Sequence, residues 1–163
     1  MGVRNCEEIG QNLQRIVQRL IANQDLVKLL YYTDKDPLSN PDLTSAELKE
    51  KVFEKLIKIV PKVGSKETAT SIVAIRVERG TQNAENDEFR DITLKVEVFV
   101  PLTQWIIKDT NLRPFAILGE IQKSLNGKTV NGLGKMAGGD FELNFLTEEI
   151  SCYEQSFSIT TYD

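Results

Sequence analysis

The chain has 163 residues, of which 40% are hydrophobic and 27% are charged, and its formal net charge is −4. This composition is typical of a globular protein and predicts a single domain, residues 1–163, with a substantial core. The chain contains no histidine, which excludes Ser-His-Asp and Cys-His catalytic groups within it, and its acidic balance gives no electrostatic reason to bind nucleic acid.

Two helical segments begin the chain. Apolar residues recur every three or four positions from Ile9 to Ile21, which predicts an amphipathic helix that starts near Cys6. The polar Asn23-Gln24-Asp25 stretch that follows allows two interpretations. Asn23 or Asp25 caps a second short helix over residues 26–32, or the helix continues with a polar patch.

A loop over residues 33–42, which contains two prolines, separates these segments from the next predicted helix. Thr44 and Glu47 have the spacing of a capping box, so we expect a helix over residues 45–59. Apolar positions at spacings of three and four give it an inner face, and charges of alternating sign give it a solvent face. Pro61 is expected to end this helix.

Alternation between apolar and polar residues predicts two strands, residues 71–79 and residues 91–102. The second strand is mainly β-branched and is predicted to be the central strand of an antiparallel sheet. Residues 80–90 form a polar connection longer than a usual hairpin loop, and such loops often carry binding residues. The interaction candidates are Glu85, Asn86, Asp87, Glu88 and Phe89, although a plain surface loop fits the pattern equally well.

The last third of the chain predicts a helix and two more strands. Trp105 is expected to anchor packing, and a helix begins at Pro114 and ends at Asn126-Gly127. The glycine-rich residues 130–140 lack the order of a phosphate-binding loop and are expected to form a flexible connector. Residues 141–146 and 153–162 alternate as a second hairpin.

The predicted element order is therefore α-α-β-β-α-β-β. It predicts an α+β fold with a four-stranded antiparallel sheet, and two or three helices packed on one face. Four strands leave two edges, and an open edge can pair with a strand of another chain.

The candidates for chemistry are few. Two cysteines, Cys6 and Cys152, are too few for a disulfide framework or a structural zinc site. A magnesium-dependent hydrolase using Asp34, Asp36, Asp87 and Asp91 is a rival hypothesis, although carboxylates in loops usually form turns and caps. No apolar run approaches the roughly 18 residues of a membrane span. We expect no catalytic residue, no metal, no cofactor and no membrane contact.

Three stretches carry a family resemblance: LQRIVQRLIANQDLVKLLYYTDKDPLSNPDLT, DITLKVEVFVPLTQWIIKDTNLRPFAILGEIQKSLNG and NGLGKMAGG. The first is an amphipathic helix followed by a tyrosine-bearing turn. The second places a tryptophan after a strand and an Arg-Pro before a helix. In this order of features the chain resembles phage neck proteins, the tail terminators and tail-to-head joining proteins.

The resemblance implies a non-enzymatic virion protein that assembles with itself into a ring, typically a hexamer, at the phage neck. Its other partners would be connector, neck or tail-tube proteins, with DNA only as passing cargo. It would assemble in the host cytoplasm. The alternative is a small binding or inhibitor module that acts as a monomer through its sheet edge or its long hairpin loop.

Overall fold

The computed structural model describes residues 7–60, 70–82, 84–85, 90–130 and 134–160. The helices there are α1 (Glu7–Ile21), α2 (Gln24–Tyr31), α3 (Ser45–Glu47) and α4 (Arg113–Leu125). The strands are β1 (Ile57–Ile59), β2 (Ile72–Gln82), β3 (Arg90–Pro101), β4 (Thr129–Val130), β5 (Gly134–Leu146) and β6 (Ile150–Thr160). These elements confirm the α+β class.

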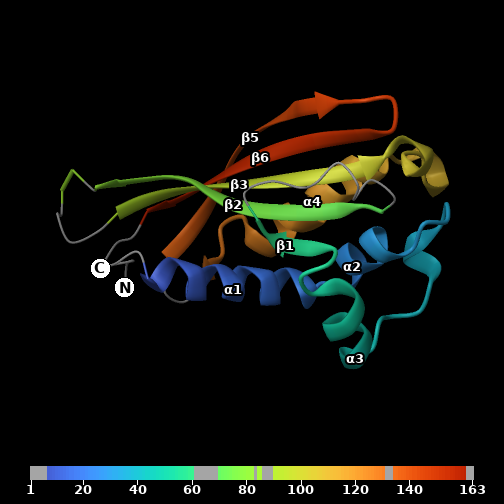
Figure 1. Ribbon diagram of the computed structural model, residues 1–163, viewed down its shortest axis with the longest axis horizontal. Helices are drawn as coiled ribbons and strands as arrows, with labels where there is room; N and C mark the ends of the chain where they lie inside the picture. The colour runs from blue at the N-terminus through green and yellow to red at the C-terminus, as the bar shows by residue number, and fades with distance from the viewer. Residues whose placement is uncertain (1–6, 61–69, 83, 86–89, 131–133, 161–163) are drawn as a thin grey trace.

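One sheet organises the molecule, with the strand order β1-β2-β3-β6-β5-β4. β3 is the predicted central strand, and it pairs antiparallel with β2 on one side and β6 on the other. Helices α1, α2 and α4 lie on the same side of the sheet (Figure 1). The main core fills the space between them and includes Leu94, Val96 and Val98 of β3, each fully buried. We call this side of the sheet the helix side and the other side the open side.

The predicted number of strands, four, is wrong: the described residues form six. The two extra strands are short and lie at the edges of the sheet, where β1 has three residues and β4 has two. β1 also runs parallel to β2, so the sheet is not antiparallel throughout. Periodicity does not reveal strands this short, because two or three residues cannot show an alternating pattern.

The predicted helix over residues 45–59 is also wrong after its first two turns. The capping box of Thr44 and Glu47 is present, but α3 passes into a wider π-helical turn, Leu48–Val52, that ends at Phe53. The backbone then reverses through Glu54, whose φ of 59° is left-handed, and enters β1. Pairing of β1 with β2 thus outweighs the helical periodicity of this segment, as tertiary contacts commonly do.

The glycine-rich residues 130–140 are not a flexible connector in the described part. Residues 134–140 belong to β5, and residues 135–138 pair with β6 before an irregular step between Gly138 and Phe141. The described part of the long loop is likewise shorter than expected, since Gly80 and Gln82 belong to β2. The final hairpin is confirmed, although both of its strands begin earlier than the alternation indicated, and residues 161–162 of the predicted second strand lie outside the described residues.

Asn23 separates α1 from α2, which decides between the two interpretations of the Asn-Gln-Asp stretch. Its side-chain oxygen accepts a hydrogen bond from the Leu26 N–H at 3.1 Å and caps α2. Its side-chain nitrogen donates to the Ser124 hydroxyl at 3.0 Å and to the Glu120 carboxylate at 3.1 Å. One side chain therefore caps a helix and ties it to α4.

We expect Asn23→Ala to lower the free energy of unfolding by about 2 kcal/mol, at the upper end for a lost cap, because the contacts with α4 are lost as well. Thr44→Ala is the matched control, since Thr44 caps α3 at the surface and bonds only within its own turn. It should cost about 1 kcal/mol or less. Urea denaturation of both variants checks this, and equal losses would contradict the role assigned to Asn23.

Candidate functional site

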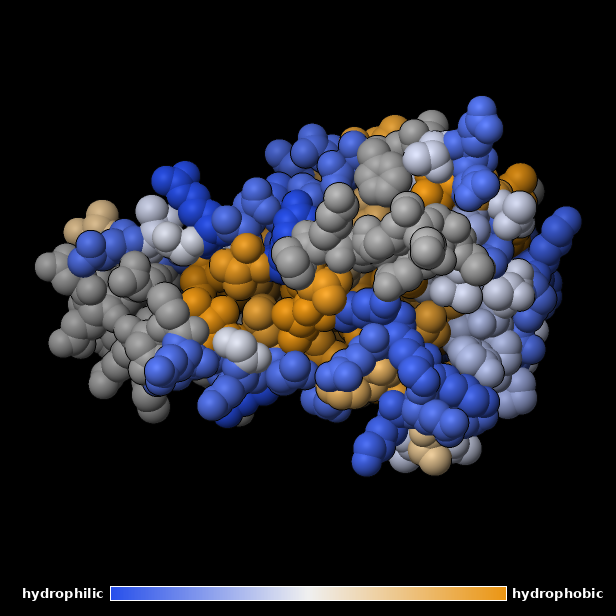
Figure 2. Space-filling view, viewed as in Figure 1, coloured by the Kyte–Doolittle hydropathy of each residue, from blue (hydrophilic) through white to orange (hydrophobic). Residues whose placement is uncertain are grey.

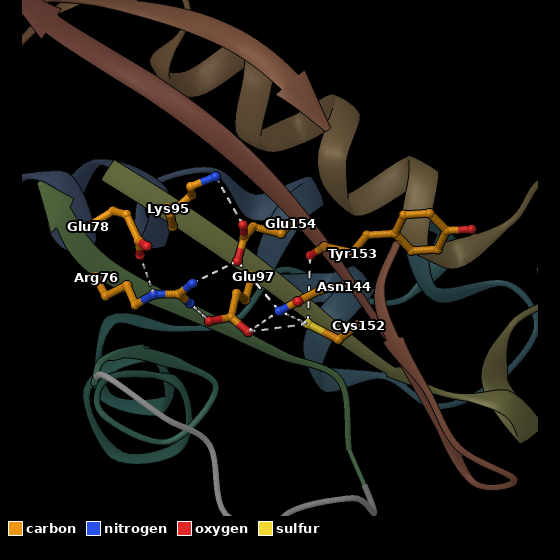
Figure 3. Close-up of polar contacts among 8 residues, drawn as sticks. All are labelled: Arg76, Glu78, Lys95, Glu97, Asn144, Cys152, Tyr153 and Glu154. Atoms are coloured by element: carbon orange, nitrogen blue, oxygen red, sulfur yellow. Dashed lines mark hydrogen bonds and ion pairs between the residues drawn. The ribbon is translucent and has the colours of Figure 1, made fainter. Parts of the chain in front are cut away.

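A polar cluster on the open side of the sheet draws side chains from four strands (Figure 3). Arg76 of β2 is at its centre and contacts three carboxylates. Its Nη2 lies 2.8 Å from Glu154 Oε2, its Nε lies 3.1 Å from Glu78 Oε2, and its Nη1 pairs with Glu97. Lys95 Nζ reaches the second oxygen of Glu154 at 3.1 Å.

Asn144 and Cys152 complete this cluster from β5 and β6. Asn144 Nδ2 donates to Glu97 Oε2 at 3.3 Å and to Glu154 Oε2 at 3.5 Å. The Cys152 thiol donates to the same Glu97 oxygen at 3.3 Å. The two buried carboxylates, Glu97 and Glu154, are thus held between cations and neutral donors. Such an arrangement joins neighbouring strands and fixes their register.

The ionisation of this cluster does not resemble that of a catalytic site. Burial would raise the pKa of Glu154, but hydrogen bonds from Lys95 and Arg76 outweigh burial and lower it. Glu154 is therefore an ion-paired carboxylate at neutral pH, and a general acid needs a raised pKa. Burial raises the pKa of Cys152 to about 12, so its thiol keeps its proton and is a poor nucleophile. We interpret the cluster as structural.

A second polar feature is the fully buried Arg113 at the start of α4. Its guanidinium donates to four backbone carbonyls: Leu29 at 2.6 Å, Tyr32 at 2.8 Å, Asp34 at 2.7 Å and Gln104 at 2.9 Å. A cation suits the carbonyl end of α2, where the helix dipole is negative. Arg113 thereby joins α2, the loop after it and the segment before α4.

An exposed apolar patch lies where α4 meets β5, on the helix side. Phe115 of α4 packs against Phe141 of β5 at 6.2 Å between ring centroids and against Tyr153 of β6 at 5.1 Å. Phe141 is 50% exposed and its neighbour Leu143 is 48% exposed. Large apolar side chains this open, side by side on one strand, are typical of a surface that contacts another protein.

Both long strands next to the sheet edges extend beyond their short partners. β1 pairs with residues 73–75 of β2, and β4 pairs with residues 134–135 of β5. The Asn126 side-chain oxygen accepts from the Gly138 N–H at 2.9 Å and extends this cover slightly. Within the described ranges, no further strand pairs with the outer sides of residues 77–81 or 139–146. Open edges of this kind are templates for strand addition.

The residues singled out from the sequence fall only partly within the described chain. Glu85 is exposed between β2 and β3, whereas Asn86, Asp87, Glu88 and Phe89 lie outside the described residues. The exposure of the apolar patch on β5 was not predicted, since residues 141–146 were expected only to form a strand of the second hairpin. No local sequence signal marks this patch, because its exposure depends on β4 ending after two residues.

Nothing in the described structure gathers the four carboxylates of the magnesium hypothesis into one site. Asp34 accepts hydrogen bonds from the Asp36 N–H and from Asn40, and Asp36 pairs with Lys108. Asp91 belongs to β3, and Asp87 lies outside the described residues. Where the structure describes the chain, no three acidic or cysteine side chains gather as metal ligands.

Trp105 anchors packing as predicted, since its indole N–H donates to the Ser151 hydroxyl at 2.9 Å and its ring lies beside Tyr153. None of the described helices is long and apolar enough to cross a membrane.

Two comparisons with known proteins bear on identity. A search of curated proteins returned no match. The family model YomW matches residues 23–158, a span that begins at the cap of α2 and runs into β6. The name comes from a phage protein and indicates phage association, without specifying a place in the virion. The chain belongs to the YomW family of phage-associated proteins.

Proposed function

We propose that this protein is a non-enzymatic structural subunit of a phage virion that assembles with itself into a ring at the neck, as a tail terminator or head-tail joining subunit. The observation that carries the proposal is the pair of sheet edges, on opposite sides of one sheet, that no strand of the described residues covers. Two different edges that pair with each other form a head-to-tail contact, and a head-to-tail contact generates a ring when its rotation closes.

The exposed apolar patch supports the same proposal. Phe115, Phe141 and Leu143 are 38%, 50% and 48% exposed, and a cluster of exposed apolar side chains favours contact with another protein. It lies directly beside the open edge of β5, so one partner can cover both. Membership of a phage-associated family supports a virion role, and the resemblance to neck proteins supports the position between head and tail.

The polar cluster of Figure 3 supports a structural role over a catalytic one. Its carboxylates are ion-paired, its thiol is protonated, and its contacts link β2, β3, β5 and β6. These contacts between four strands hold the sheet together as one rigid unit, which suits a subunit that assembles with others. The formal net charge of −4 also suits a ring through which DNA passes, since an acidic lumen repels phosphates.

Native mass spectrometry of the purified protein across a range of concentrations tests the proposal. The expected result is one closed oligomer of several copies, typically six, that replaces the monomer as concentration rises. A protein that stays monomeric at its highest soluble concentration would contradict the proposal and favour a monomeric binding module. Within virions, the protein should co-purify with connector and tail-tube proteins.

A further inference from the structure

We propose that β5 of one copy pairs antiparallel with the open edge of β2 in a second copy, with Phe141 and Leu143 entering an apolar groove between β2 and α1 of that copy. This inference rests on the proposed self-assembly and assigns the residues that carry it. It makes the sheet continuous from one subunit to the next.

Strand direction follows from the topology. β2 is antiparallel to β3, β3 to β6, and β6 to β5. β5 therefore runs opposite to β2, and in a neighbour of the same orientation the two edges meet as an antiparallel pair. This is the more stable pairing per residue, and it keeps the helix sides of both sheets aligned.

On the helix side of the sheet, the β5 edge carries exposed apolar side chains and the β2 edge has open space beside it. Phe141 and Leu143 point to the helix side of β5, since they pair with the helix-side residues Gln155 and Tyr153 of β6. Apolar surface is exposed between α1 and β2, beside β1 (Figure 2). A hollow of about 260 Å³ lies next to this surface, between α1 and β1, and is lined in part by Val17, Ile57 and Ile59.

Gly80 leaves open space for an aromatic ring on the helix side of β2. It pairs with Ile92, whose side chain is in the main core, so position 80 faces the helix side. A Cβ added at Gly80 would meet no atom within 4 Å. An edge glycine with open space above it can be covered by an aromatic side chain from the neighbouring strand, and Phe141 is the candidate.

The open side adds complementary charge. Glu142 pairs with Glu154 of the polar cluster and so points to the open side of β5. Arg79 pairs with Thr93, two residues from Lys95, and points to the open side of β2. Both Glu142 and Arg79 are exposed. In a continuous sheet they meet on the same side across the new strand pair, where opposite charges are favourable. The charge and the groove together favour a second copy as the occupant.

Two single variants test the inference by complementation. Leu143→Glu breaks the β5 surface and leaves the β2 edge intact, and Gly80→Glu fills the β2 groove and leaves β5 intact. Each variant alone should stay monomeric at concentrations at which the wild type assembles. An equimolar mixture should form a dimer and nothing larger, because it contains one intact contact. Native mass spectrometry with isotope labelling of one variant identifies the pair.

A charge exchange serves as the matched control for folding defects. Glu142→Arg and Arg79→Glu should each weaken assembly at least tenfold, and the double variant should recover most of the loss. Circular dichroism should show unchanged folds, because all four positions are exposed or open in the monomer.

The outcomes separate this inference from the proposed function. If the wild type stays monomeric, the proposed function and this inference both fail. If the wild type assembles and both Leu143→Glu and Gly80→Glu assemble equally well, the proposed function stands and the strand pairing is overturned. If Gly80→Glu still dimerises and the mixture shows no complementation, the contact joins two copies of β5 about a twofold axis, which also overturns it.

Discussion

Replacing Arg113 with methionine should lower the free energy of unfolding by about 4 kcal/mol, the largest loss we expect from a single substitution in this chain. Burial lowers the pKa of Arg113, but an arginine with this many carbonyl acceptors remains charged. Methionine replaces the aliphatic stem of arginine but is shorter than arginine and cannot donate a hydrogen bond. It would leave the carbonyls of Leu29, Tyr32 and Asp34 without their donor inside the protein.

Urea denaturation monitored by circular dichroism measures this loss. Arg113→Lys is the informative companion, because it keeps the charge and cannot reach all four carbonyls at once. It should lose about half as much stability. Lys123→Met is the matched control, since Lys123 is exposed and pairs only with nearby Glu120, and it should change stability by less than 1 kcal/mol. If Arg113→Met lowered the free energy of unfolding no more than Lys123→Met, the structural role assigned to Arg113 would be contradicted.

Arg76→Met should cost about 3 kcal/mol at neutral pH, because it leaves Glu97 and Glu154 facing each other across β3 and β6 without their shared cation. The pKa of Glu154 is lowered in the folded protein. The stability that this carboxylate contributes is therefore complete above its unfolded pKa of 4.5 and is lost as the pH falls through its lower folded value.

The cost of Arg76→Met should consequently shrink as the pH falls through the lowered folded pKa of Glu154, because a protonated Glu154 no longer gains from the nearby cation. Unfolding curves of the wild type and of Arg76→Met at several pH values measure how the difference in stability changes with pH. Glu78→Gln is the control, since Glu78 bonds the same guanidinium from a half-exposed position, and should cost less than 1 kcal/mol. If the stability lost in Arg76→Met did not change with pH, the ion pair assigned to Arg76 and Glu154 would be contradicted.

The helices and long strands could be predicted from the sequence because their signals are local. Ile92, Leu94 and Val96 repeat with a period of two, and that period alone places β3. The cap residues Asn23 and Thr44 likewise act on the turn that follows them in the chain. Such features depend on neighbours within a few residues and can therefore be predicted from the sequence alone.

The features that failed depend on contacts between distant segments. The sequence pattern places Ile57 and Ile59 at the end of a helix. They form a strand because they pair with the edge of β2, in which each partner lies 16 residues later in the chain. Arg113 reads as an ordinary residue before a helix, yet its partners lie about 80 residues earlier. The exposure of Phe141 and Leu143 depends on β4 ending after two residues, which no pattern within β5 reveals.

The account depends most on one claim, that copies of this chain join head to tail through different edges of the same sheet. Electron microscopy of the purified wild-type protein at its highest soluble concentration tests it most directly. The account predicts closed rings with rotational symmetry and one repeating contact between neighbours. Particles the size of one chain, or pairs related by a twofold axis, would contradict it.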